Sequence, residues 1–538
     1  MKQDTFLKGA AVLGAAGMLV KVLGAFFRIP LGNIIGSDGM GYYQVGYTIY
    51  NFLLAFTAAG FPTAISKLVS EKRAQGDHRG AHKVFKVSFK LLFGLGAAGM
   101  LIIAVFAGFL ANTVFSNPKA YYAVLAMSPA IFFVSLLAAF RGYFQGMKDM
   151  KPTAISQIVE QAARVTLGLS LAILIIYIIS AEVQYAAAAA SFGAGAGAIV
   201  GTLAMARIYM KKRGKIFRSI QEGARIEEDS VPSIIRDLLK VAVPIAIGAS
   251  VVPMINMFDT FLVVRRLQDI GFTYFEANSL YGQLQGMANT LINLPQVLTV
   301  AIAVSLVPVI SESYTRGDDA AVKSDTRSAV RVGLLMGLPA SIGLLVLAGP
   351  IMSLLYPNEP ASAGQVLFAL APAVIFLTQV QVLTGVLQGL GKAHIPVRNL
   401  LIGAFFKLII TYILTGIPAV NVRGAAIGTV MAYAIAFSLN LYSVKKETGA
   451  KISFRVVAVR PILAAGIMGA VVFSVHRLLL GVIGNSLATV IAMPIGGVVY
   501  LFLLMITRAI GKEDFDLLPK GDRLFKLMNR FGLMKRKK

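Results

Sequence analysis

Cysteine and tryptophan are both absent from the 538 residues, and charged side chains are scarce. Without cysteine the chain can hold no disulfide and no thiolate metal site, and redox chemistry does not indicate its compartment. Without tryptophan, the aromatic side chains at a membrane interface have to be Tyr and Phe. Only 14% of the residues are charged and 57% are hydrophobic, which is more apolar surface than a soluble fold buries. The composition predicts an all-α integral membrane protein without a sizeable soluble catalytic domain.

Fourteen apolar stretches of membrane-spanning length can be marked along the chain. They lie at about 6–29, 42–66, 87–111, 121–146, 152–180, 185–210, 238–264, 279–310, 328–355, 363–389, 396–418, 424–444, 457–480 and 484–507. The first stretch follows Lys2 and Lys8 but is longer than the core of a signal peptide, so we expect it to be a helix. The expected division is an N-lobe at 1–210, a basic cytoplasmic linker at 211–236, a C-lobe at 237–446, two further helices at 447–510 and a basic amphipathic tail at 511–538.

The net charge of +26 is best explained by membrane topology, because cytoplasmic loops of membrane proteins collect Lys and Arg. Most of these residues fall at the N-terminus, in the even-numbered connections and in the tail. The odd-numbered connections hold only Lys119, Arg265, Arg266, Arg423 and Arg477. We therefore expect a multi-pass protein of the cell membrane with both termini cytoplasmic. The tail is expected to bind anionic membrane lipids rather than nucleic acid. For Arg265 and Arg266, either the outer loop has a role or the helix boundary lies elsewhere.

The first half of the chain is repeated in the second half. Four motifs recur in the same order at offsets between 234 and 244 residues. The pairs are Glu71 with Gln75-Gly76-Asp77 against Glu312 with Arg316-Gly317-Asp318, Ser128-Pro129-Ala130 against Ala371-Pro372-Ala373, Gln145-Gly146 against Gln388-Gly389, and Lys211-Lys212 against Lys445-Lys446. A unit of six helices enters the membrane from the same side in both copies, so the repeats are parallel. Two such lobes around a central cavity predict alternating access.

Ionisable side chains within the predicted helices are costly in a membrane and indicate a cavity or a charged partner. These residues are Lys21, Arg28, Glu160, Arg164, Asp259 and Lys407. At an offset of 243 residues Arg164 corresponds to Lys407, so each lobe carries one cation at the same depth of its fifth helix. Two cations that face each other across a cavity would suit an anion such as a pyrophosphate.

Structural roles for the same residues are the alternative. Glu160 and Arg164 have the i,i+4 spacing of a neutral helical pair, and Lys407 could form a buried salt bridge with Asp259. Lys21 and Arg28 lie nearer to helix ends and could extend to the interface.

No metal site or enzyme is predicted. His78 and His82 have helical spacing, but no third ligand is close in the sequence,. No set of side chains typical of catalysis is recognisable.

Several motifs resemble the polysaccharide-exporter branch of the multidrug/oligosaccharidyl-lipid/polysaccharide superfamily. They are Lys21-Val22-Leu23-Gly24 with Arg28, Asn33-Ile34-Ile35-Gly36, and Arg141-Gly142 with Gln145-Gly146. The likeness covers essentially the whole chain and is greatest to the stage V sporulation protein B group, which includes Gram-positive lipid II flippases of the MurJ type.

This resemblance implies a V-shaped pair of six-helix lobes whose cationic cavity receives the sugar and pyrophosphate of a lipid-linked peptidoglycan precursor. It also implies that the last two helices form a groove for the lipid tail and that the first-helix arginine of the cavity is Arg28. The chain departs from the proteobacterial pattern Asp-Arg-Leu-x-Glu-Leu-Pro in the eighth helix, where residues 289–295 read Asn-Thr-Leu-Ile-Asn-Leu-Pro. Thr290 and Asn293 replace the Arg and Glu, which leaves Asn289 and Asn293 as polar cavity residues.

The sequence thus predicts a monomeric flippase for a lipid-linked saccharide, with lipid II as the expected substrate and without a cofactor. The expected phosphate-binding residues are Lys21, Arg28, Arg164 and Lys407. Membrane potential, sodium and protons all stay open as the driving force. Two other functions compete: a drug or metabolite antiporter of the same superfamily, and a membrane-embedded polymerase or scaffold. Exporters of cationic drugs need acidic cavities, whereas these helices carry more bases than acids. A polymerase needs a large outer loop with acidic residues.

Overall fold

A computed structural model describes residues 2–222, 229–450 and 458–507, and all regular structure in these residues is helical. Twelve of the described helices are long and apolar enough to cross a membrane. The chain is therefore a multi-pass membrane protein. The basic tail expected at 511–538 lies outside the described residues.

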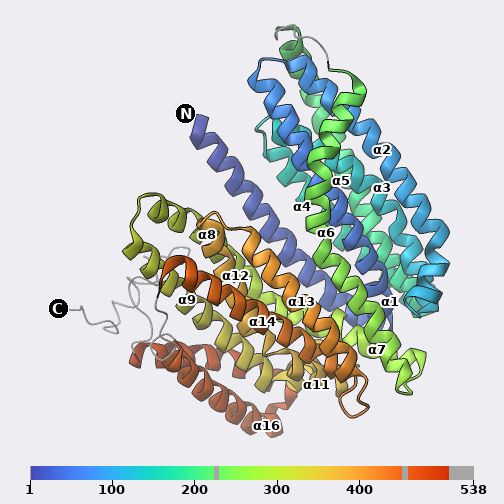
Figure 1. Cartoon of the computed structure of the whole chain (residues 1–538). Helices are drawn as coiled ribbons and strands as arrows, with labels where there is room; N and C mark the ends of the chain where they lie inside the picture. The colour runs from blue at the N-terminus through green and yellow to red at the C-terminus, as the bar shows by residue number, and fades with distance from the viewer. Residues whose placement is uncertain (1, 223–228, 451–457, 508–538) are drawn as a thin grey trace. The chain divides into compact units, whose positions relative to one another are not determined.

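The chain divides into two compact units, Met1–Gly282 and Gln283–Lys538. The first unit contains α1 (Lys2–Ala74), α2 (His78–Phe109), α3 (Tyr121–Gly146), α4 (Lys151–Ile173), α5 (Val183–Glu222), α6 (Val231–Asp269) and α7 (Tyr274–Tyr281) (Figure 1). The second contains α8 (Asn289–Thr315), α9 (Asp319–Val346), α10 (Ala348–Leu355), α11 (Ser362–Leu370), α12 (Ala373–Gly389), α13 (His394–Thr415), α14 (Arg423–Thr448) and α16 (Val459–Ile506).

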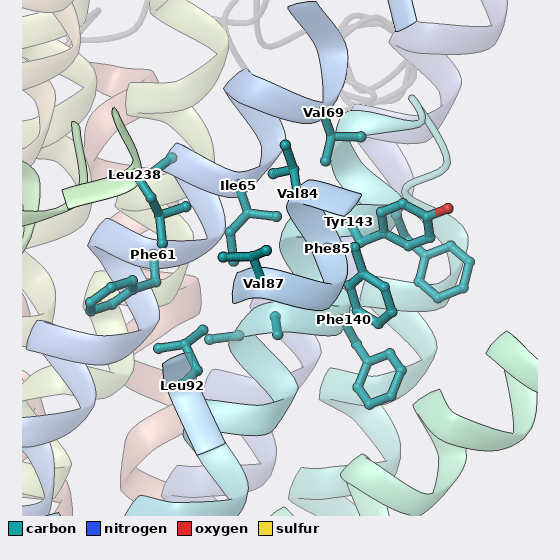
Figure 2. Packing of buried hydrophobic residues seen from close by; sticks show 14 of the residues in the cluster. Phe61, Ile65, Val69, Val84, Phe85, Val87, Leu92, Phe140, Tyr143 and Leu238 are labelled. Carbon is teal, nitrogen blue, oxygen red and sulfur yellow. The ribbon is translucent and has the colours of Figure 1, made fainter. Parts of the chain in front are cut away.

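A cluster of buried apolar side chains in the first unit joins α1, α2 and α3 with α5 and α6. Figure 2 shows Ile65 of α1 beside Val87 of α2, with the rings of Phe85 and Tyr143 close together. The centroids of these two rings are 4.5 Å apart, a stacked contact that adds to the stabilisation from burial. Because lipid tails are as apolar as these side chains, such close packing rather than the hydrophobic effect holds helices together in a membrane.

Helix α6 belongs to the first unit, whereas the repeat predicts it as the first helix of the C-lobe. The close approach of α6 to α1 explains this: a Cβ atom at Gly60 would lie only 2.4 Å from the carbonyl oxygen of Ala242. Helices also extend into both ends of the expected linker at 211–236, since α5 continues through Glu222 and α6 starts at Val231. Lys and Arg are good helix formers, so a basic stretch extends α5 readily.

Helix α6 also extends farther at its other end than the apolar pattern predicts. It ends at Asp269 rather than near residue 264, so Arg265 and Arg266 lie in its last turns and not in a loop. The Arg265 guanidinium lies 5.6 Å from the Phe261 ring centroid, and Arg266 forms a 3.4 Å ion pair with Asp269. The helix boundary therefore lies beyond the one that the apolar pattern predicts, and both arginines belong to α6.

Two of the long helices are interrupted by a glycine. The span Leu13–Ala74 is 62 residues long and breaks at Gly36 (φ 64°), and Val459–Ile506 is 48 residues long and breaks at Gly484 (φ 74°). A positive φ is accessible to glycine without the steric cost that a Cβ atom brings. Each break separates two of the apolar stretches marked in the sequence.

The backbone geometry at the matched motifs repeats between the units. The Asp77 carboxylate caps α2 by accepting a 2.6 Å hydrogen bond from the Gly80 amide, and Asp318 caps α9 in the same way through Ala321 at 2.9 Å. These caps satisfy amides that have no partner within their helix. The equivalence of the turns supports the duplication inferred from the sequence.

The fifth-helix cations also occupy equivalent places in their own units. A Cβ atom at Gly193 of α5 would lie 2.9 Å from the Arg164 carbonyl oxygen, and one at Gly428 of α14 would lie 3.3 Å from that of Lys407. The same backbone contact therefore marks both positions.

Candidate functional site

A ladder of tyrosines on α1 runs between two of the predicted arginines. Tyr43, Tyr47 and Tyr50 follow the i, i+4, i+7 spacing of one helix face,. Neighbouring ring centroids are 5.7 Å and 6.2 Å apart. The Arg28 guanidinium lies 4.9 Å from the Tyr47 centroid and that of Arg164 lies 5.1 Å from Tyr50, both within cation–π distance,. Arg28 thus stacks on an aromatic side chain of its own unit.

Arg164 is fixed by two neighbours but keeps unused hydrogen-bonding capacity. Its Nη2 atom donates a 2.6 Å hydrogen bond to the Tyr50 hydroxyl and lies 3.6 Å from the Glu160 carboxylate. Its Nε atom is buried without a hydrogen-bond partner among the described residues. Because a guanidinium offers five N–H donors in a rigid plane, Arg164 has donors left for an anion.

Glu160 contacts two arginines rather than one. Its carboxylate accepts a 2.7 Å hydrogen bond from Nη2 of Arg141, whose Nε donates to the Ser156 hydroxyl at 3.0 Å. The neutral pair of Glu160 and Arg164 considered from the sequence is present, but its single negative charge is shared. Arg164 and Arg28 both stack on rings of the tyrosine ladder, and Glu160 connects Arg164 to Arg141. We call Arg28, Arg141, Glu160 and Arg164 the arginine cluster.

Arg141 is the member of this cluster that the sequence did not identify as a site residue. It belongs to a family motif, but its partner lies 19 residues away on the next helix. An arginine inside a predicted helix followed by a helix with an unexplained Glu is the signal that could have found it.

Close packing between α4 and α5 positions the acidic residue of the cluster. A Cβ atom at Gly197 would lie 2.6 Å from the Glu160 carbonyl oxygen, so the two backbones can approach only because that residue is glycine. On the other side, a Cβ atom at Gly24 of α1 would lie 3.5 Å from the Gln161 side-chain amide nitrogen. Glycine on α5 thus allows α4 to lie where its charged side chains meet the cluster.

Asp259 of α6 is buried in the first unit with only 1% of its surface exposed. The adjacent Thr260 accepts a 2.6 Å hydrogen bond from the Tyr281 hydroxyl. Tyr281 lies close enough to interact electrostatically with both Asp259 and Arg28. Asp259 and Arg28 thus both lie within electrostatic range of the same tyrosine. Lys21, by contrast, is exposed on α1.

The remaining predicted site residues belong to the second unit. Lys407 of α13 is 8% exposed, whereas its neighbours Phe405 and Phe406 are 60% and 43% exposed, so the lysine is on the packed face of its helix. Asn289 and Asn293 form an amide ladder on α8. Asn289 donates to Gln285 at 2.8 Å, and Asn293 donates to the Asn289 carbonyl at 2.7 Å. Both asparagines are half-buried.

Family comparisons agree with the resemblance noted in the sequence. The family model described as polysaccharide biosynthesis protein matches residues 6–314, and the MatE model matches 285–413. Stage V sporulation protein B of Bacillus subtilis (strain 168) is 28% identical and covers 97% of this chain and 99% of its own. Lipid II flippase MurJ of the same organism is 26% identical and covers 92% and 94%.

Solved structures show the same fold. A structure of lipid II flippase MurJ in an inward closed conformation has a TM-score of 0.67 at 18% identity and covers 92% of this chain and 98% of its own. An inward-facing multidrug resistance MATE family transporter has a TM-score of 0.65 at 14% identity, with coverage of 80% and 96%.

Proposed function

Since the chain belongs to the polysaccharide biosynthesis protein family, within the multidrug/oligosaccharidyl-lipid/polysaccharide superfamily, we propose that it is an alternating-access flippase for a lipid-linked saccharide pyrophosphate. We further propose that this substrate is the peptidoglycan precursor lipid II. A relative named lipid II flippase matches almost the whole chain, which supports this choice. One full-length relative is named a flippase, and the similar solved structures are a flippase and a transporter, so the protein is proposed to act without catalysis.

The observation that carries the proposal is the net positive charge of the arginine cluster. Arg141 and Arg164 share the Glu160 carboxylate on a partly buried surface, where these three side chains are 12–13% exposed. Arg28 adds a third guanidinium, stacked on Tyr47 of the same tyrosine ladder. A pyrophosphate carries two negative charges that arginine can bind bidentately. The attraction is stronger in such a low-dielectric setting than at a loop surface. A cationic drug would instead meet repulsion here.

The architecture proposed for this activity is fourteen crossings. The 62-residue and 48-residue spans measure about 93 and 72 Å at ~1.5 Å per residue, far more than a ~30 Å hydrocarbon core,. Breaks at Gly36 and Gly484 would divide each into two crossings. Both termini would then be cytoplasmic, as the distribution of Lys and Arg predicts. The two halves of α16 would be the two helices outside the repeat, and they would form a groove for the lipid tail.

Lys407 is proposed to bind the pyrophosphate from the second lobe, because it occupies the place that Arg164 has in the first. Asn289 and Asn293 are proposed as polar residues that contact the saccharide. Asp259 is proposed as a charge partner near the cations, with membrane potential, sodium or protons as the energy source. The working form is proposed to be a monomer in the cell membrane.

Depletion in a living cell tests the substrate. If the proposal holds, loss of the protein raises the amount of lipid II on the inner leaflet, as measured by extraction and mass spectrometry of labelled precursors. Accumulation of a different lipid-linked saccharide would support the flippase function but would mean that lipid II is not the substrate. Unchanged precursors together with increased drug sensitivity would instead favour a multidrug antiporter.

A further inference from the structure

The two units differ at the residues around their equivalent cations. Arg164 and Lys407 share a backbone environment, but the position one turn earlier is Glu160 in the first unit and Gly403 in the second. At the same offset Arg141 corresponds to Thr384. The linked acid and arginine are thus a feature of the first unit alone.

Helix packing does not require this acid. In the second unit a Cβ atom at Gly403 would lie 2.4 Å from the carbonyl oxygen of Ala432, which is the counterpart of Gly197 on the facing helix. The glycine that permits close approach has therefore changed sides between the units. Both helix pairs achieve the same contact, and only the arrangement with glycine on α5 leaves room for a charged side chain on α4.

Glu160 also has unequal contacts with its two arginines. Its carboxylate is 2.7 Å from Arg141 and 3.6 Å from Arg164. Arg141 is anchored by Ser156 at 3.0 Å, and Arg164 by Tyr50 at 2.6 Å. Glu160 can therefore leave Arg164 while it keeps its shorter bond to Arg141. Each guanidinium would still be held by a hydroxyl group.

We propose that Glu160 is an internal counter-anion that competes with the phosphate groups of the substrate for Arg164, and that Arg141 is the positioning residue that holds Glu160 when the phosphates are bound. This inference rests on the proposed flippase function. A transporter must release its substrate, and without a competing carboxylate Arg164 would hold a phosphate group too tightly. The return of the carboxylate to Arg164 helps to expel the phosphate and speeds release.

Binding and transport, measured separately, test this role. The probe is a fluorescent lipid II analogue with a shortened lipid chain, bound to the full-length protein in detergent and then followed in proteoliposomes. Glu160→Gln should bind the probe about tenfold more tightly, which corresponds to ~1.4 kcal/mol, and should flip it more slowly. Arg141→Gln should bind it about tenfold more weakly, because Glu160 then contacts Arg164 alone. The double variant should bind as tightly as Glu160→Gln, and Lys211→Gln should match the wild type.

The outcomes separate the inference from the proposed function. If the wild type neither binds nor flips the probe, the proposed function fails and the inference fails with it. If the wild type does both and folded Glu160→Gln binds equally or more weakly, the counter-anion role is overturned and the flippase stands. Should Glu160→Gln not fold, wild-type affinity in Arg141→Gln would overturn the inference instead.

Discussion

The side chains of the arginine cluster contribute differently to phosphate binding, and Arg28 contributes both a charge and a planar pair of donors. Arg28 binds phosphate bidentately in our account, and lysine can supply its charge but not its planar pair of donors. Hydrogen bonds to charged groups contribute ~1.5–3 kcal/mol. We therefore expect Arg28→Lys to impair transport and Arg28→Ala to abolish it. Complementation of a flippase-depleted strain measures this, with membrane levels of each variant checked.

The matched control for Arg28 is Lys211, an exposed base of α5. Lys212 is less suitable because it pairs with Asp149. Lys211→Ala should support full growth. Normal growth of a strain that carries Arg28→Ala combined with Lys407→Ala, at wild-type protein levels, would mean that the cations are structural.

The Tyr50 hydroxyl offers a subtler change, because it orients Arg164 without being part of any charge pair. Tyr50→Phe keeps the ring under the guanidinium and removes the 2.6 Å hydrogen bond. A buried hydrogen bond of this kind is worth about 1–3 kcal/mol. We expect affinity for the fluorescent lipid II analogue to fall about fivefold or more. Tyr314→Phe, at a residue 50% exposed, should leave affinity unchanged, and equal losses in both variants would contradict a specific role for Tyr50.

Among the helices, α4 and α5 approach each other closely at the small residue Gly197. In Gly197→Ala the new methyl group would lie 2.6 Å from the Glu160 carbonyl oxygen, so the helices must separate. Overpacking of this kind typically costs ~1–3 kcal/mol. The purified variant should unfold at a lower temperature and flip lipid more slowly. Gly214→Ala on the same helix has no atom within 4 Å of its Cβ and should be neutral or slightly stabilising,. If both variants have the same melting temperature, the close approach is not essential.

The repeated turns contain a second testable contact between helices. After α3 the Asp149 amide bonds the Phe144 carbonyl at 3.0 Å, and after α12 the Lys392 amide bonds that of Leu387 at 2.8 Å, so these positions are equivalent. Each forms a salt bridge within its own unit, Asp149 with Lys212 and Lys392 with Glu447. The same contact therefore exists with reversed charges.

Exchange of the two charges of the Asp149–Lys212 salt bridge should be tolerated. Asp149→Lys or Lys212→Asp alone places like charges together, whereas the double variant has the charge order of the second unit. Because both groups are partly exposed, we expect each single change to lower stability by at most ~1 kcal/mol. The double change should recover most of it in a thermal double-mutant cycle. Additive losses would show that the two residues do not interact.

At the level of the whole molecule, the sequence predicted the features that leave a pattern in the chain itself, namely the spanning helices and the repeat. Apolar length identified the spanning helices. The offset of 243 residues paired Arg164 with Lys407, whose backbones make equivalent contacts in their own units. The offset could not show that α6 packs with α1, because a repeat records ancestry and not the packing of one state. The link between Arg141 and Glu160 was also hidden, since it depends on the angle between two helices. The tyrosine ladder was visible only as an unremarked helical spacing.

The most direct test of the account is flipping of fluorescent lipid II in proteoliposomes that contain the purified protein. External dithionite destroys only the label on the outer leaflet, so transport appears as additional bleaching over time. We expect rapid loss with the wild type and with Lys211→Ala, and a rate near that of empty vesicles with Arg28→Ala combined with Arg164→Ala. If the wild type fails to move lipid II or any other lipid-linked pyrophosphate, or if the double variant moves it at the wild-type rate, then the arginine cluster is not the anion site of a flippase.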